Sequence, residues 1–327
     1  MAIHPGPPAA SVAPDRPARQ GIQQRTPRRR RRDGRVAAVY LVPAAVVIVG
    51  LMAYPIYQLV LISFYDYGQP QAAGVAPLHF IGMDNYVVLF GDPQFWTVLV
   101  QTILFAAVCV VGSLLVGTAL AVLATRVRVV PRTLLFLASL GAWATPALAG
   151  SYIWLFLFDQ DFGLVNEVLS GLGLHGVAGF SWTYDRYTAF GLVAAEVIWC
   201  SFPFVLITMY AGIKAISADV LEAAALDGAS NTRAAVSVIL PILRPVLMIA
   251  TIQSIIWDFK IFTQIYVMTN GGGVAGRNLV LNVYAYQKAF AGSEYGRGAA
   301  IGVVMTLLLL SITGLYIRTQ RKSEPLT

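Results

Sequence analysis

Three polar residues stand close together inside an apolar stretch in the last quarter of the chain. Lys260, Thr263 and Gln264 are followed by Val267 at the spacing i, i+3, i+4 and i+7, which predicts one shared face if the stretch is helical. An ammonium group, a hydroxyl and an amide can hydrogen-bond a polyol or hold an anion, so this face suits binding of a polar solute. Asp258 is two residues from Lys260 and is expected to face another helix or subunit.

Residue types that can support catalysis are present, but they do not occur at the spacing of a catalytic or metal-binding motif. The three histidines, His4, His79 and His175, do not have the spacing of metal ligands. The two cysteines, Cys109 and Cys200, each lie in an apolar run, so a disulfide framework is excluded. Residues 171–176 match G-x-G-x-x-G, but no predicted strand precedes them, and no G-x-x-x-x-G-K-[ST] pattern occurs. We therefore predict a chain that is not an enzyme and that carries no cofactor or metal.

The composition indicates that a membrane positions these residues. Hydrophobic residues make up 57% of the chain and charged residues 12%, with a mean hydropathy of +0.68, whereas soluble domains carry about 25% charged residues. Stretches with few or no charges predict an all-α integral membrane domain over 36–318, with six transmembrane helices at about 36–63, 96–125, 133–158, 187–213, 241–268 and 298–317.

The placement of Lys and Arg predicts the orientation of these helices. If the N-terminus is cytoplasmic, 18 of the 23 basic residues lie on inside segments and four on outside loops, as the positive-inside rule requires. The tails 1–35 and 319–327 are then both cytoplasmic. Residues 1–35 are rich in Pro and Arg and are expected to be disordered, with contacts to membrane lipid rather than to nucleic acid.

The longest cytoplasmic loop between predicted spans, 214–240, contains helix signals. Ser217 is placed to cap a short helix, and Gly228 offers it a C-terminal stop. A second short helix is expected to run toward Pro241, whose fixed φ suits the first turn of the next span. Small alanines between these signals allow another protein's backbone to come close, although an ordinary amphipathic loop has a similar composition.

This loop resembles the EAA loop of ATP-binding-cassette (ABC) importer permeases. Glu222-Ala223-Ala224, Gly228 and Leu240-Pro241 fit the spacing EAA-x3-G-x9-[IV]-x-L-P. One departure is Ala235-Val236, where an aromatic residue is usual. Further segments are similar to the carbohydrate branch of that family, on the side of the maltose permease (Tyr54-Pro55, Ser63-Phe64-Tyr65, Ile198-Trp199, Pro203-Phe204 and 265–272).

The resemblance implies a MetI-like permease bundle in the bacterial cytoplasmic membrane, forming half of the path of an ATP-driven sugar importer. A disaccharide such as trehalose is expected, with glycerol phosphate as an alternative. The implied partners are a second homologous permease, two ATPase subunits that carry ATP and Mg, and an extracytoplasmic sugar-binding protein. A stand-alone secondary transporter needs internal repeats and ion-coupling carboxylates, and the predicted spans offer only Glu196 and Asp258.

The resemblance also implies two sets of site residues. Coupling to the ATPase is expected at Glu222, Ala223, Ala224, Leu226, Asp227, Gly228, Ala229 and Ser230. The substrate pathway is expected at Cys200, Ser201, Phe204, Lys260, Thr263 and Gln264, with the Phe204 ring stacked on a pyranose. Helix-packing polarity and core aromatics remain the alternative for the second set.

Two further features have two interpretations each. Glu196 either lines the pathway or pairs with a basic residue of the partner. Trp182 and Tyr184 lie in the outside loop 159–186, and Tyr187 directly follows this loop. These aromatic residues are expected either to contact the solute-binding protein or to form an interfacial aromatic belt.

Overall fold

The computed structural model describes residues 27–321, and contacts divide the chain into two units, 1–56 and 57–327. The helix α1 (Pro27–Ile62) contains the described part of the first unit. This helix begins at Pro27, inside the predicted tail 1–35, where arginines, which are good helix formers, precede the apolar run. Residues 1–26 and 322–327, parts of the two predicted tails, lie outside the described residues.

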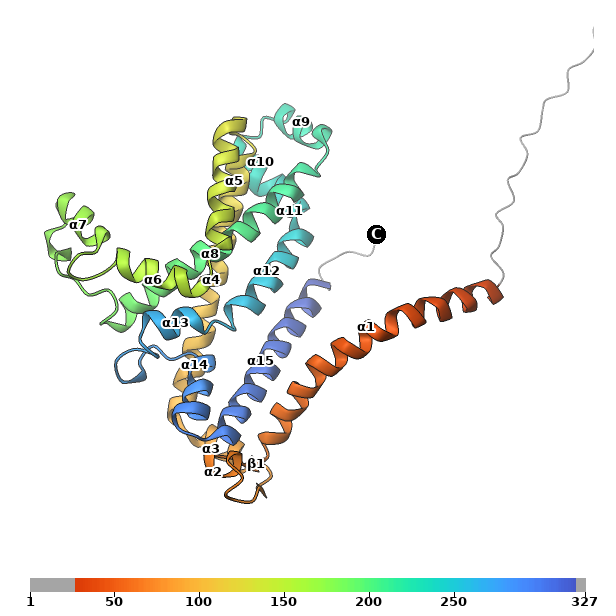
Figure 1. Ribbon diagram of the computed structural model, residues 1–327. Coiled ribbons are helices and arrows are strands. Elements are labelled where there is room, and N and C mark those ends of the chain that lie inside the picture. The colour runs from red at the N-terminus through yellow and green to blue at the C-terminus, as the bar shows by residue number, and fades with distance from the viewer. Residues whose placement is uncertain (1–26, 322–327) are drawn as a thin grey trace, which may run out of the picture. The chain divides into compact units, whose positions relative to one another are not determined.

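Two long helices form the centre of the second unit (Figure 1). The helices α4 (Pro93–Ala124) and α8 (Arg186–Lys214) pack along each other. The Asp92 side chain caps α4 by accepting a hydrogen bond from the backbone N–H of Gln94 at 2.8 Å. The close approach needs Gly117, because a Cβ there would lie 2.5 Å from the Cβ of Val205 on α8.

The predicted span 133–158 is not one straight helix. It forms α5 (Val129–Ala144) and α6 (Ala147–Leu157), which are bent by 106°. The cause is Pro146: the residue before a proline is pushed out of the helical region, and Thr145 is extended with ψ 122°. An uncharged run predicted the apolar character of this segment but not its bend.

The predicted span 241–268 also differs from expectation at its start. Pro241 lies in the short helix α11 (Leu240–Ile242), which follows the π-helical η2 (Ala235–Ile239). The membrane-type helix α12 (Arg244–Asp258) begins only after a 72° bend and has its own proline in the first turn. Pro241 therefore does not open the span.

The same predicted span is interrupted near its outer end. The helix α12 ends at Asp258, and α13 (Thr263–Met268) begins after four non-helical residues, 259–262. A carboxylate at the end of α12 and a lysine in the break disfavour a continuous apolar helix here. This break separates residues that the 3.6-residue period had placed on one face.

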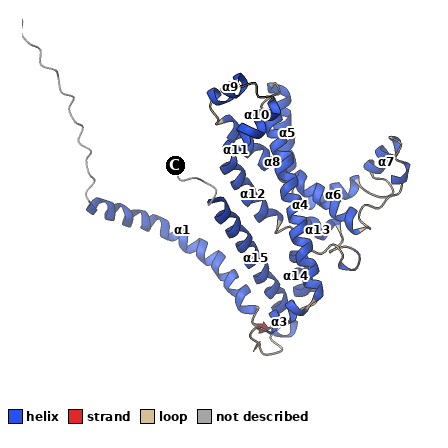
Figure 2. Ribbon diagram, turned by 180° about the vertical axis from the view of Figure 1, so that it is seen from behind, coloured by secondary structure: helices blue, strands red, loops and turns tan. Residues whose placement is uncertain are grey.

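The remaining elements join these helices. The strands β1 (Tyr65–Asp66) and β2 (His79–Phe80) pair antiparallel, with Tyr65 opposite Phe80. The other helices are α2 (Gln69–Ala72), α3 (Asp84–Gly91), α7 (Leu164–Gly171), η1 (His175–Val177), α9 (Ala218–Leu226), α10 (Asn231–Ala234), η3 (Val274–Gly276), α14 (Leu281–Tyr286), η4 (Gln287–Ala291) and α15 (Tyr295–Arg321). Figure 2 shows helices in nearly all of the described chain, with the strand pair close to α3.

Within residues 27–321, four helices are long and apolar enough to cross a membrane, and up to six spans result if each bent pair counts as one. Buried side chains form two clusters in the second unit. One contains Phe105, Val193 and Ile265, and the other contains Val205, Met209 and Leu243. Both clusters include residues of α4 and α8, so these two helices are the scaffold on which the polar positions are held.

Candidate functional site

The segment 218–230, called the coupling segment below, folds as a short helix with a glycine stop. The helix α9 begins directly after Ser217 and ends at Leu226. Gly228 has φ +73°, and the backbone N–H of Ala229 donates to the carbonyl of Ala224 at 3.0 Å. This bond across a left-handed glycine is the Schellman pattern of helix ends, so the sequence signal at Gly228 has a local structural cause.

One face of the coupling segment is open. Ala224 is buried, whereas Glu222, Ala223 and Asp227 are exposed, and the Leu226 side chain is 89% exposed. Glu222 and Leu226 are four residues apart and lie on the same face of α9. A carboxylate beside an unpacked leucine, both on a short helix, is the kind of surface that another protein can cover.

The coupling segment ends at Ser230, directly before α10, and hydrogen bonds to Ser230 fix the start of that helix. The Ser230 hydroxyl accepts a hydrogen bond from the backbone N–H of Arg233 at 3.3 Å, and its carbonyl accepts one from Ala234 at 2.8 Å. Figure 1 places α9 and α10 together at the end of the second unit that is opposite α3 and β1. The coupling segment and the strand pair therefore lie at opposite ends of the bundle.

The second predicted site begins on α8. Cys200, Ser201 and Phe204 are half-buried, and Cys200 donates through Sγ to Oε1 of Glu196 at 3.8 Å. The ring of Phe204 meets Trp257 of α12 edge to face, with centroids 5.1 Å apart. One edge or face of the Phe204 ring is therefore packed against α12.

The structure corrects the predicted shared face of Lys260, Thr263, Gln264 and Val267. Lys260 lies in the non-helical break with an exposed side chain, while the other three belong to α13. Thr263 and Gln264 occupy the first turn of α13 and are half-buried. Lys260 precedes α13 in the chain, so it does not share a helix face with Thr263 and Gln264.

The break is tied to both neighbouring helices. The Ser201 hydroxyl of α8 is a hydrogen-bonding neighbour of the Asp258 carboxyl at the end of α12. On the other side, Nδ2 of Asn282 donates to the carbonyl of Ile261 at 3.4 Å. The predicted residues of α8 therefore do lie beside the break that contains Lys260, at the position where α8, α12 and α14 come together.

Sequence reasoning did not anticipate how deeply the two acidic residues of the predicted spans are buried. Glu196 is fully buried and Asp258 is 3% exposed. One oxygen of each carboxyl, Oε2 and Oδ2, has no hydrogen-bond partner among the described residues, nor has the hydroxyl of the buried Ser113 on α4. The three side chains lie on α8, α12 and α4, the helices that pack together in the second unit.

The outer loop separates into packed and free aromatics. Trp182 is held inside the loop, because its Nε1 donates to Oδ1 of Asn166 at 2.6 Å and its ring meets Phe158 and Phe180. Tyr184 and Tyr187 are exposed. Of the three aromatics singled out in the sequence, only these two are available to a partner or to the membrane interface.

Comparison with known proteins places these features in a family. Residues 113–323 match the family described as the binding-protein-dependent transport system inner membrane component. The chain is 40% identical to the diacetylchitobiose uptake system permease protein DasB of Streptomyces coelicolor, over 87% of this chain and 86% of that one. It is 28% identical to the trehalose transport system permease protein SugA of Mycobacterium tuberculosis, over 90% and 91%.

A further relative is named for a different solute, and a solved structure has the same fold. The sulfoquinovosyl glycerol transport system permease protein SmoG of Agrobacterium fabrum is 32% identical, over 89% of this chain and 92% of that one. Among solved structures, a chain of a bacterial ABC transporter that imports the acidic polysaccharide alginate has a TM-score of 0.77 and 19% identity, covering 91% of this chain and 99% of that one. At that identity the likeness establishes a common MetI-like permease fold.

Proposed function

This chain belongs to the family of binding-protein-dependent transport system inner membrane components, and we propose that it is a permease subunit of an ATP-driven importer of small saccharides. The observation that carries the proposal is the 40% identity to a diacetylchitobiose permease over 87% of the chain. The exposed coupling segment and the polar break beside α8 supply the two surfaces that such a subunit needs, one toward an ATPase and one toward the cargo.

The cargo we propose is a disaccharide. Relatives named for diacetylchitobiose and for trehalose both carry two-ring sugars, at 40% and 28% identity. Trehalose and diacetylchitobiose are accordingly the first two candidates. The exposed ammonium group of Lys260 also suits an anionic cargo such as glycerol phosphate, which is the competing substrate class.

The proposed mechanism uses no covalent chemistry on this chain. A second permease completes the path, two ATPase subunits hold ATP and Mg, and an extracytoplasmic binding protein delivers the sugar. Closure of the ATPases moves α9 and α10 together, because the Schellman bond fixes the linker between them to α9 and the Ser230 hydrogen bonds fix it to α10. Their motion reaches α12 through η2 and α11, and so changes which side of the membrane the break faces.

The function is tested by uptake. A strain that lacks this gene is expected to lose uptake of one radiolabelled disaccharide, tested among trehalose, diacetylchitobiose and maltose, and to regain it with the gene restored. A tagged copy of the chain is expected to copurify with an ABC ATPase. Uptake of labelled glycerol phosphate alone would select the anionic substrate class, and purification without any ATPase would contradict the importer assignment.

We propose that both termini are cytoplasmic, as the distribution of Lys and Arg predicts. A cysteine at Ser230, which is exposed on the coupling segment, is expected to resist a membrane-impermeant thiol reagent in intact cells and to react after lysis. A cysteine at Val75, 82% exposed in the loop after α2, is expected to react in intact cells. Labelling in the reverse pattern contradicts the orientation.

A further inference from the structure

Six aromatic rings from separate parts of the chain form a continuous row, called the aromatic ladder below. Neighbouring rings have centroids 5.0 to 6.0 Å apart, which is direct ring contact. The members are Tyr67, Tyr295, Phe290, Tyr286, Phe262 and Tyr266. The row starts beside the strand pair and ends at Phe262, two residues after Lys260. It therefore connects one end of the bundle with the break.

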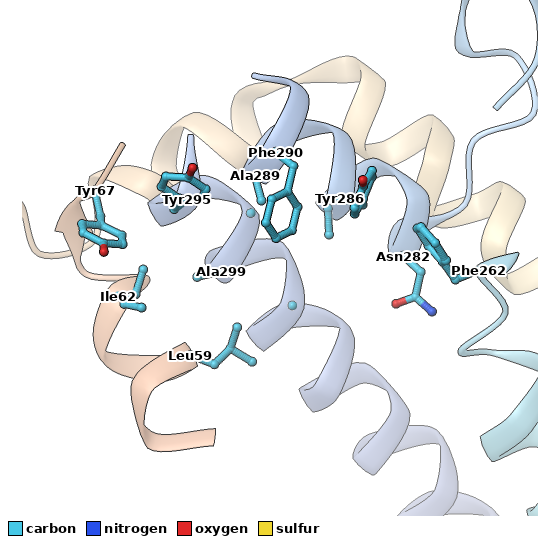
Figure 3. A pocket seen from close by; sticks show the side chains of 13 residues that line it. Leu59, Ile62, Tyr67, Phe262, Asn282, Tyr286, Ala289, Phe290, Tyr295 and Ala299 are labelled. Carbon is cyan, nitrogen blue, oxygen red and sulfur yellow. The ribbon is translucent and has the colours of Figure 1, made fainter. Parts of the chain in front are cut away.

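Five of the six rings, all except Tyr266, line an open groove with a volume of about 620 Å³ (Figure 3). Small residues of η4 and α15, such as Ala289, Gly298 and Ala299, make its floor, so the rings stand above a surface without bulky side chains. Leu59 and Ile62 line the opposite side. The volume lies within the range of about 300–1,000 Å³ that is typical of small-molecule sites.

Local backbone features hold the rings in place. Tyr286 ends α14 and Phe290 lies in the π-helical η4, a rare helix type that is enriched at functional sites. Gly298 is required beside η4, because a Cβ there would lie 2.5 Å from the Cβ of Ala289. At the outer end, the backbone N–H of Gly296 donates to the carbonyl of Tyr67 at 2.9 Å.

The whole α14 segment is also anchored to α4. The backbone N–H of Leu281 donates to Oγ1 of Thr102 at 2.9 Å, and the Tyr284 hydroxyl donates to Oδ2 of Asp92 at 2.7 Å. Burial, and then this bond to Asp92, raises the pKa of the Tyr284 hydroxyl. The rings on the other face of α14 are therefore presented by a fixed support.

The lining of the groove is mostly apolar, with a few interspersed polar groups. The polar groups are the phenolic hydroxyls of Tyr67, Tyr286 and Tyr295 and the amide of Asn282, which lies beside Phe262 (Figure 3). An interfacial aromatic belt stays at one depth, whereas this row runs from the start of α15 past α14 to the break before α13. Apolar rings with interspersed hydroxyl and amide groups match a pyranose, which has C–H faces and a hydroxyl rim.

We propose that the aromatic ladder is a binding track along which a saccharide passes between the strand-pair end of the bundle and the Lys260 break. The assignment rests on the proposed function, because it takes a sugar as cargo. The rings that line the groove contribute stacking faces, and the hydroxyls and Asn282 exchange hydrogen bonds with the sugar as it moves. The track adds six residues to the predicted pathway, and neither the sequence motifs nor the relatives' names give these residues a role.

The test uses Phe290, which is 62% exposed on the ladder, and Phe162 of the outer loop, which is also 62% exposed, as the matched control. The full complex of both permeases, ATPases and binding protein is reconstituted in vesicles with either F290C or F162C. A charged, water-soluble thiol reagent is applied with and without saturating labelled disaccharide under turnover. We expect the sugar to slow labelling at position 290 by about tenfold, which is about 1.4 kcal/mol, and not at position 162.

Transport provides the second readout. Phe290→Ser is expected to lower sugar uptake about tenfold, again about 1.4 kcal/mol, while ATP hydrolysis stimulated by the loaded binding protein continues. Phe290→Tyr, which keeps the ring, is expected to restore uptake even if the serine variant folds poorly. Phe162→Ser is expected to transport normally.

The outcomes separate the track from the importer assignment. A thiol at position 290 that reacts equally with and without sugar overturns the track. A thiol that never reacts indicates lipid or a partner helix over the ladder and overturns it too. If the unaltered complex takes up labelled disaccharide while the Phe290 variants behave as the wild type, only the track fails. If the unaltered complex takes up no saccharide, the proposed function and the track both fail.

Discussion

Sugar uptake is expected to fall to background when Gly228 is replaced by valine. The residue has φ +73°, a conformation that costs a β-branched residue roughly 1–2 kcal/mol. A Cβ at this position meets nothing within 4 Å, so the effect comes from the backbone alone and not from a clash. Loss of the left-handed turn breaks the bond from Ala229 to Ala224 and rotates α9 away from α10.

Matched variants isolate this cause. Gly228→Asn is expected to keep most uptake, because asparagine tolerates the left-handed region. Gly171→Val is the control: that glycine also ends a short helix and has open space around it, but its φ is not positive. Each variant is quantified in the membrane by immunoblot and assayed for uptake and for ATP hydrolysis. Normal transport by Gly228→Val contradicts the coupling assignment.

The charge on the same surface gives an independent check. Glu222→Lys reverses an exposed carboxylate without touching the helix stop, so insertion and assembly are expected to be normal while uptake is lost. If the coupling segment docks on the ATPase, the two variants fail at one step, with membrane amounts unchanged and stimulated ATP hydrolysis impaired.

The sequence predicted the short helix and the glycine stop of the coupling segment because their signals are local. A glycine after a short apolar helix and its Schellman bond involve residues within six positions of one another. The membrane spans were likewise visible as uncharged runs. The bend at Pro146 is local too, but a composition criterion for spans gives no weight to a single proline.

The arrangement of the residues expected to line the pathway was harder to predict for a physical reason. The period of 3.6 residues assumes an unbroken helix, and Asp258 and Lys260 lie at the point where that helix stops. The buried partner of Asp258 is Ser201, 57 positions earlier in the chain, as only the fold can show. The aromatic ladder is likewise visible only in the fold, because Tyr67, Phe262 and Tyr286 come from three separate segments of the chain.

Uptake is expected to drop roughly 5- to 150-fold when Lys260 or Thr263 is truncated to alanine. The range follows from about 1–3 kcal/mol for a polar group left unmatched in a closed site, at 1.4 kcal/mol per decade. Unwound backbone at membrane depth is tolerated where it is buried in protein or lines a water-filled cavity, and Lys260 is the exposed side chain of such a break. Thr263 follows at the start of α13.

The neighbouring Ile261 supplies the control, because its side chain packs against the apolar core and its contact with Asn282 uses the backbone carbonyl. Ile261→Val removes one methylene and is expected to leave uptake nearly unchanged. Lys260→Gln then separates the two substrate classes, since an amide can still hydrogen-bond a sugar hydroxyl but cannot neutralise a phosphate. Partial uptake in Lys260→Gln supports a neutral saccharide, and complete loss supports an anion. Wild-type uptake in both alanine variants would place the route elsewhere than the break.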